Sequence, residues 1–208
     1  MNVLAIGAHY DDLELGCGGT LARMVREGHN VWGYVVTKSG YATPEGVRIR
    51  KDEDAREEGK RAADIIGYRL ISGEIPTFEV EATEKIQAGI MSLVEDHEID
   101  MVLTHWIHDA HHDHRNLAAA TLHCTKHVPR VLMYRSNWYQ TDQSFDETFF
   151  VDISDTWNIK EKAIREYAGE LGRTGDTWIR YFKNQAQNYG IQCGAEYAEC
   201  FEVVKWKM

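Results

Sequence analysis

The chain has 208 residues, which is enough for a domain with a substantial hydrophobic core. Hydrophobic residues make up 43% of it, which is typical of a globular protein and argues against disorder. Asp and Glu outnumber Lys and Arg by 33 to 23, giving a net charge of −10. This balance argues against a nucleic-acid partner, because phosphates need a positive protein surface.

The four cysteines include no C-x-x-C pair and are expected to be free thiols, because a chain with its own core does not need a disulfide framework. The first residues lack the basic segment and apolar run of a signal peptide. No stretch approaches the roughly 20 apolar residues of a membrane helix. We therefore expect a soluble, cytoplasmic protein with no membrane partner.

Short apolar runs bounded by glycine or polar residues predict strands, and apolar residues three or four apart predict helices. In chain order the sequence predicts strand 3–8, helix 13–27, strand 30–37, loop 39–47, helix 50–66, strand 68–72, helix 81–97, strand 99–104, loop 105–114, helix 115–127, strands 130–135 and 148–153, two helices within 155–189, and strand 196–206. Gly28 and Gly67 are expected to end the first two helices. With no repeat or linker, we expect a single domain, residues 1–208.

Strands that alternate with helices predict an α/β fold: a Rossmann-like three-layer sandwich with a mostly parallel sheet. In such sheets the ligand lies beyond the carboxyl ends of the strands. The two most unusual polar clusters, at 9–14 and 105–114, each follow directly after a predicted strand. We therefore expect them to meet in one crevice, which would be the active site.

The first cluster runs His9-Tyr10-Asp11-Asp12-Leu13-Glu14. His9 and Asp12 are three residues apart and can face one point. Two adjacent carboxylates point in different directions, so one can bind a metal while its neighbour stays free. The alternative is that Asp11 or Asp12 only caps the following helix, where aspartate is favoured.

The second cluster holds five of the ten histidines within residues 105–114, with two aspartates between them. Imidazole is a good zinc ligand, and carboxylates orient such imidazoles. Neither cluster contains cysteine, so a structural zinc finger is a poor interpretation. Together the clusters can supply the ligands, base and oxyanion-stabilising group of a hydrolytic zinc site. The residues alone do not say which histidine takes which part.

The run from Gly7 to Glu14 resembles the signature of the PIG-L / LmbE-like de-N-acetylase family, and the loop Asp109 to Arg115 resembles its second motif. The resemblance implies that His9, Asp12 and His114 bind Zn²⁺. The same resemblance makes the three catalytic residues Asp11 as general base, His111 as the group that stabilises the oxyanion, and Asp113 as the group that orients His111. Iron is an alternative metal, because such sites accept either. The resemblance also implies a homo-oligomer.

Two positions depart from the family pattern, since Tyr10 and His112 stand where the family usually has proline. Both side chains could instead reach into the substrate crevice. Arg50 could bind a substrate hydroxyl or phosphate, although a solvated helix surface is the alternative. Trp106 could stack on a sugar ring.

Trp138 and Tyr139 are further candidates for stacking on a sugar ring. The family implies zinc-dependent removal of an N-acetyl group from an N-acetylglucosamine-type conjugate, a small-molecule substrate. The alternatives are a zinc amidohydrolase for a different acylated amine and a metal- or sugar-binding protein without turnover. A dinucleotide-binding domain is disfavoured, because Gly16-Cys17-Gly18-Gly19 lacks the G-x-G-x-x-G spacing.

Overall fold

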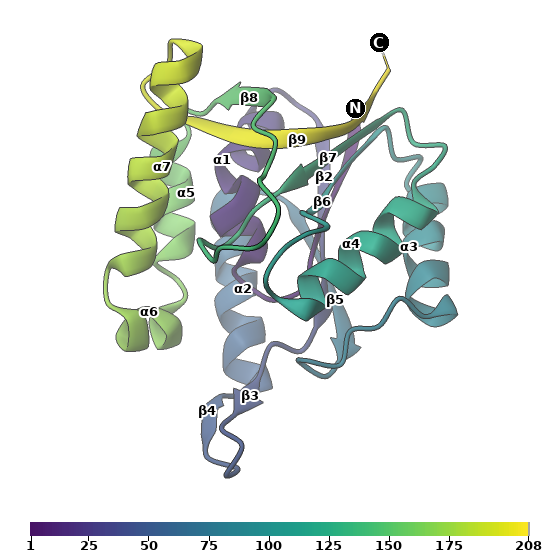
Figure 1. Cartoon of the computed structure of the whole chain (residues 1–208), viewed down its shortest axis with the longest axis vertical. Coiled ribbons are helices and arrows are strands. Elements are labelled where there is room, and N and C mark those ends of the chain that lie inside the picture. Colours follow the sequence, from purple (N-terminus) through teal and green to yellow (C-terminus); the bar gives the residue numbers. More distant parts are fainter. Residues whose placement is uncertain (208) are drawn as a thin grey trace.

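The computed structural model describes residues 1–207 (Figure 1). Its main sheet contains β1 (Asn2–Gly7), β2 (Asn30–Thr37), β5 (Arg69–Ile75), β6 (Met101–His105), β7 (Arg130–Tyr134), β8 (Phe149–Asp152) and β9 (Ala198–Trp206). The spatial order is β5-β2-β1-β6-β7-β9-β8. The first five of these strands are parallel, and β9 runs antiparallel to both β7 and β8.

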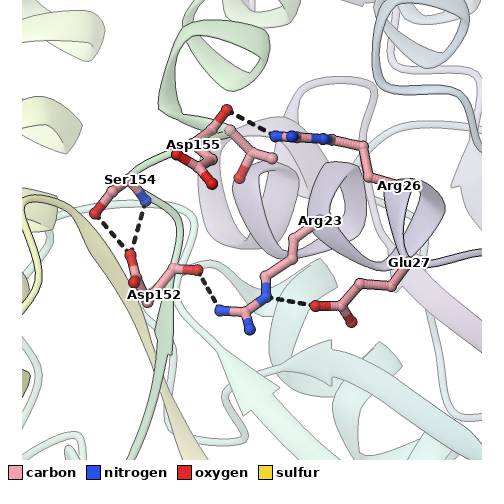
Figure 2. A pocket seen from close by; sticks show the side chains of 7 residues that line it. Arg23, Arg26, Glu27, Asp152, Ser154 and Asp155 are labelled. Atoms are coloured by element: carbon pink, nitrogen blue, oxygen red, sulfur yellow. Dashed lines mark hydrogen bonds and ion pairs between the residues drawn. The ribbon is translucent and has the colours of Figure 1, made fainter.

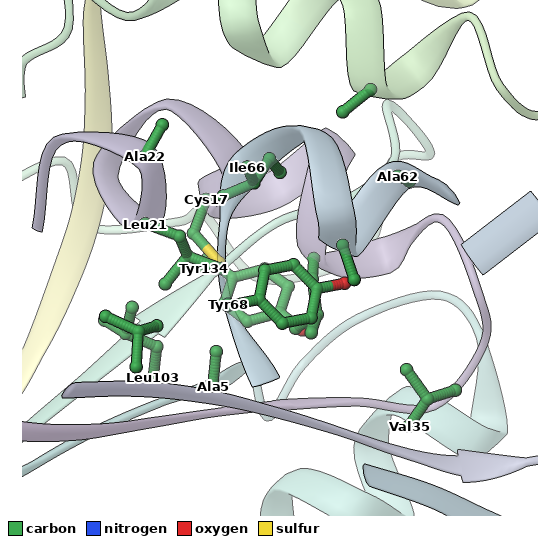
Figure 3. Close-up of a cluster of buried hydrophobic side chains, with 14 of the residues drawn as sticks. Ala5, Cys17, Leu21, Ala22, Val35, Ala62, Ile66, Tyr68, Leu103 and Tyr134 are labelled. Atoms are coloured by element: carbon green, nitrogen blue, oxygen red, sulfur yellow. The ribbon is translucent and has the colours of Figure 1, made fainter. Parts of the chain in front are cut away.

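Helices cover both faces of this sheet (Figure 1). They are α1 (Asp12–Arg26), α2 (Asp52–Ile66), α3 (Glu84–Asp96), α4 (His112–Cys124), α5 (Trp157–Ile164), α6 (Ala168–Thr174) and α7 (Thr177–Cys193). Val3 and Ala5 of β1 pack toward α1 and α2, in the core shown in Figure 3. Leu4 and Ile6 pack on the opposite face, with α3 and α4. Because alternate residues of a strand face opposite sides and both sides are covered here, β1 is apolar from Val3 to Ile6.

The predicted α/β fold with a mostly parallel sheet is therefore confirmed, and the predicted strand 30–37 coincides with β2. Gly67 ends α2 with a φ of 95°, in the left-handed conformation that favours glycine. All four cysteines are free, as expected. In residues 1–207 no helix is long and apolar enough to cross a membrane.

Three predicted boundaries are wrong, and one is the end of the predicted loop 105–114, because α4 already begins at His112. The predicted loop 39–47 contains β3 (Tyr41–Ala42), which pairs with β4 (Arg48–Arg50) in a protruding hairpin, so Arg50 ends a strand and does not begin a helix (Figure 1). Strands this short show no readable alternation. The region 155–189 holds three helices instead of two, since Gly175, with a φ of 61°, separates α6 from α7.

The chain leaves β1 toward β2 on one side, whereas β6 lies on the other side of β1. At such a reversal of strand order the loops diverge and leave a crevice at the carboxyl ends of the strands. The two polar clusters follow β1 and β6, so the fold brings them together at this point.

Candidate metal centre

The first cluster lies in the turn from β1 to α1. Asp11 precedes the helix with a φ of 119°, which is unusual for a residue with a side chain, and that side chain makes no capping hydrogen bond. The Asp12 carboxylate accepts the backbone N–H of His9 at 2.7 Å. The alternative that these aspartates only cap the helix is therefore not supported.

The second cluster lies in the turn from β6 to α4. His111 is the N-cap of α4, and its Nδ1 accepts the backbone N–H of Asp113 at 3.2 Å. With Nδ1 acting as an acceptor, the neutral ring carries its proton on Nε2. His114, in the first turn of the helix, is nearly fully buried and faces the first cluster.

Donor atoms of three residues converge between the clusters, and the two imidazoles lie against different oxygens of one carboxylate. His114 Nε2 lies 3.3 Å from His9 Nδ1 and 3.3 Å from Asp12 Oδ1. His9 Nδ1 lies 3.4 Å from Asp12 Oδ2. Ligand atoms bound at about 2.0–2.1 Å to a tetrahedral Zn²⁺ are about 3.3 Å apart. The geometry and the two-nitrogen, one-carboxylate donor set therefore fit a zinc ion.

The electrostatics of these groups favour a cation. Burial opposes charge on His114, but Asp12 and Asp109 raise its pKa to about 10. Burial likewise opposes ionisation of Asp12, but the histidines His114 and His105 hold its pKa well below the usual range. The protein thus stabilises positive charge where these donor atoms meet.

Each of the two histidines has its own carboxylate on the far side of the ring. His9 Nε2 lies 2.9 Å from Asp113 Oδ2, and His114 Nδ1 lies 3.3 Å from Asp109 Oδ1. Asn137 donates to both oxygens of Asp109 at 2.9 Å. Carboxylates in this position fix the ring and make the imidazole a better ligand.

Asp113 does bond His111, the residue it was predicted to orient, but through its backbone N–H and not through its carboxylate. That carboxylate is hydrogen-bonded to His9, and it also accepts the backbone N–H groups of Phe78 at 2.8 Å and Val80 at 3.2 Å. The backbone N–H of Asp113 is what orients His111. A residue in the first turn of a helix can bond a histidine with its side chain or with its backbone N–H. The sequence does not show which of these two groups of Asp113 contacts His9 and which contacts His111.

Asp11 and Arg50 form an ion pair beside the converging donor atoms. Arg50 Nη1 lies 3.3 Å from Asp11 Oδ2, and Arg50 Nη2 donates to Glu58 at 2.9 Å. Burial raises the pKa of Asp11 to about 8, against the lowering effect of Arg50. Arg50 is itself 6% exposed, so the alternative of a solvated surface residue is excluded.

A cavity with two lobes opens from this centre. The Trp138 lobe, about 300 Å³, is lined by His9, Asp11, Asp12, Leu15, His111, His114, Ser136, Asn137, Trp138, Tyr139, Arg173, Thr174 and Trp178. The Phe78 lobe, about 280 Å³, is lined by His9, Asp11, Ser39, Tyr41, Arg50, Thr77, Phe78, His111, Tyr139, Glu170 and Arg173. The lobes share His9, Asp11, His111, Tyr139 and Arg173. A substrate that reacts where the lobes meet can therefore extend in two directions.

Tyr10 and Trp106 do not line either lobe, so their predicted contact with substrate is wrong. Tyr10 is 1% exposed; its ring packs on Gly59, and its hydroxyl donates to Ser72 Oγ at 2.7 Å. Trp106 is also 1% exposed, and its Nε1 donates to Glu202 at 3.1 Å. Burial of a large ring is favourable, and each polar atom finds a partner inside the protein.

His112 is exposed beside His111 and is not among the residues that line the two lobes, so its contact with substrate stays a prediction. Its Nε2 lies 3.0 Å from the backbone oxygen of Phe78, and its ring stacks on His111. Without the proline that the family has here, this side chain supports the neighbouring loop.

Several residues of the site carry no recognisable signal in the sequence. Ser136 donates to Asp12 Oδ1 at 2.8 Å, and Phe78, Tyr41, Arg173 and Trp178 line the lobes. Ser136 and Phe78 follow β7 and β5, Tyr41 lies in β3, and Arg173 and Trp178 lie on α6 and α7, so only the fold brings them close. The expected aromatic candidates Trp138 and Tyr139 do line the cavity.

A further surface cleft of about 350 Å³ lies at the end of α1, next to the segment after β8 (Figure 2). Its arginines are already engaged with the protein. Arg23 donates to Glu27 and to the backbone oxygen of Asp152, and Arg26 donates to that of Asp155. The charges in this cleft therefore stabilise the contact between two segments.

Fold and site together define an α/β protein with a candidate metal centre at the point where strand order reverses. A family model described as PIG-L, GlcNAc-PI de-N-acetylase, matches residues 4–125, and the chain belongs to this family. The diacetylchitobiose deacetylase of Thermococcus kodakarensis is 26% identical over 218 residues, which cover 95% of this chain and 80% of that protein.

Two solved structures show the same fold. N,N′-diacetylchitobiose deacetylase from Pyrococcus horikoshii has a TM-score of 0.83 at 19% identity, over 98% of this chain and 83% of that one. GalB, the 4-carboxy-2-hydroxymuconate hydratase of Pseudomonas putida KT2440, has a TM-score of 0.81 at 18% identity, over 100% and 97%. The fold therefore carries more than one reaction, and the function has to be argued from the site.

Proposed function

We propose that the chain is a single-domain, zinc-dependent hydrolase that removes the N-acetyl group from an N-acetylglucosamine-type sugar conjugate, releasing acetate and a free amine. The observation that carries this proposal is the convergence of His9, Asp12 and His114 at the base of a cavity that Asp11 and His111 also line. Membership of the PIG-L family and the diacetylchitobiose deacetylase relative support the choice of substrate.

His9, Asp12 and His114 would hold the metal. A zinc ion held there would supply Lewis-acid chemistry, which polarises an acyl carbonyl and lowers the pKa of water to near neutrality. Iron would fit the same donor set. The paired carboxylates Asp113 and Asp109 keep both imidazoles in the ligand orientation.

Asp11 takes the proton of the attacking water and returns it to the nitrogen as the C–N bond breaks. Its carboxylate borders both lobes, and Arg50 fixes its position. His111 faces the cavity and donates its Nε2–H to the acyl oxygen as negative charge develops there. One water is consumed, and its atoms end in acetate and in the amine.

The test is acetate release from a panel of N-acetylglucosamine conjugates, with metal-depleted and zinc-restored protein compared. We expect acetate only with metal. His114→Ala should lose stoichiometric zinc. Asp11→Asn should keep zinc and lose a factor of about 10² or more in kcat. The exposed variant Asp142→Asn is the control for both.

The opposite results identify the alternatives. Zinc at full occupancy without acetate from any conjugate would indicate a different acylated amine or a protein that binds without turnover. Near-normal kcat in Asp11→Asn would remove the general base from this position. Hydration of an unsaturated acid, without amide hydrolysis, would place the chain with the hydratase that shares its fold.

A further inference from the structure

Phe78 combines an exposed ring with an unusual backbone. Its side chain is 51% exposed at the edge of the cavity. Its φ is 70°, in the left-handed region that a bulky residue rarely adopts. Such a conformation persists only where the surroundings enforce it, and it is often found at ligand sites.

Hydrogen bonds to the metal side of the cavity enforce this conformation. Phe78 donates its N–H to Asp113 Oδ2 at 2.8 Å, and its backbone oxygen lies 3.0 Å from His112 Nε2. The ring is stacked on His111, with 5.6 Å between centroids and 21° between planes. The protein thus holds an apolar ring against a side chain that faces the reaction centre.

We propose that Phe78 determines substrate specificity: its ring is the platform on which a second sugar ring, next to the acetylated one, packs in the Phe78 lobe. This inference rests on the function proposed above. Aromatic faces suit the apolar faces of sugars. The lobe combines the aromatic side chains of Tyr41, Phe78 and Tyr139 with polar groups that can bond sugar hydroxyls.

The other residues of the lobe suit the same occupant. Tyr41 lies edge-on to Phe78 at 6.3 Å and adds to the aromatic wall. The buried hydroxyl of Thr77, which lines the lobe, has no hydrogen-bond partner within residues 1–207 and can bond a sugar hydroxyl. Because both lobes meet at His111, one ring can react at the centre while the next rests on Phe78.

Glycine makes a clean test, because it removes the ring and also accepts a φ of 70° without strain. The experiment measures kcat and KM of wild type, Phe78→Gly and Phe78→Tyr on N-acetylglucosamine and N,N′-diacetylchitobiose. In Phe78→Gly the ratio of kcat/KM for disaccharide over monosaccharide should fall about 10-fold, mainly through KM. Phe78→Tyr keeps the ring and should restore most of this ratio.

Ile191→Ala is the matched control, because this side chain is 80% exposed and lies outside both lobes. It should keep the wild-type ratio. An unchanged ratio in Phe78→Gly overturns the proposal. A changed sedimentation coefficient in Phe78→Gly also overturns it, because the ring would then cover a contact between copies of the chain.

Failure of the proposed function gives a different result, namely no acetate from either sugar with wild type. Calorimetric binding of the two sugars to zinc-loaded wild type and Phe78→Gly then decides the inference alone. Tighter disaccharide binding that the glycine variant loses supports it. Equal binding of both sugars to wild type overturns it.

Discussion

The contacts of Asp113 predict that its carboxylate acts on the metal and not on His111. The carboxylate accepts three N–H groups: one from His9 at 2.9 Å and two from the backbone of the loop at 78–80. In Asp113→Asn one of these donors must face an NH₂ group. Loss of a carboxylate behind a metal-binding histidine costs about 10–100-fold in metal affinity, or about 1.4–2.8 kcal/mol.

The assay is a zinc titration of the metal-depleted variant in competition with a chromophoric chelator, followed by kcat at saturating zinc. We expect the zinc Kd to rise by this factor and kcat to recover largely when zinc saturates the site. Asp109→Asn should behave in the same way through His114, and the exposed Asp142→Asn should not. A wild-type Kd combined with a low kcat would refute the reasoning and assign the carboxylate to His111.

Three further substitutions test features that hold the fold together, namely the buried ion pair of Lys160 and Glu199 and the buried rings of Tyr10 and Trp106. Lys160→Met removes the ammonium group that lies 2.6 Å from the buried carboxylate of Glu199. The free energy of unfolding should fall by about 3–5 kcal/mol, which lowers Tm by about 6–20 °C on thermal denaturation. The double variant Lys160→Met with Glu199→Gln should recover part of the lost unfolding free energy. Gly59→Ala would place a Cβ 2.2 Å from the Tyr10 ring, so the free energy of unfolding should fall by about 1–3 kcal/mol on thermal denaturation. A zinc titration of this variant should show weaker zinc binding. Trp106→Phe should keep kcat/KM on the preferred sugar within about twofold, because this buried residue does not touch the substrate; a larger loss would return it to the site.

The sheet and the position of the site follow from the sequence because their signals are local. The apolar run of β1 and the Gly67 helix end are readable without any knowledge of the fold. The rule that ligands lie at the carboxyl ends of parallel strands then brings His9 and His114 together, although they are 105 positions apart.

The direction in which each side chain points is a tertiary property, and there the sequence was insufficient. Tyr10 and Trp106 lie next to reactive residues in the chain, but their rings turn into the core. Phe78 lies in no motif and reaches the cavity only because Asp113 holds its loop. Proximity in sequence to a motif therefore predicts contact with substrate poorly, because other loops, a short strand and the helices α6 and α7 supply the missed residues.

The role of Asp113 joins metal binding to substrate selection. The same Oδ2 atom that meets the His9 ring also accepts the N–H of Phe78, and this bond helps to hold an otherwise strained backbone. Asp113→Asn at saturating zinc should therefore lower the preference for disaccharide over monosaccharide, as Phe78→Gly does. Asp109→Asn, which touches no residue of that loop in residues 1–207, should weaken zinc binding and leave the preference unchanged. Equal effects of the two variants on this preference would show that the metal site alone determines it, and that the Phe78 loop does not depend on Asp113.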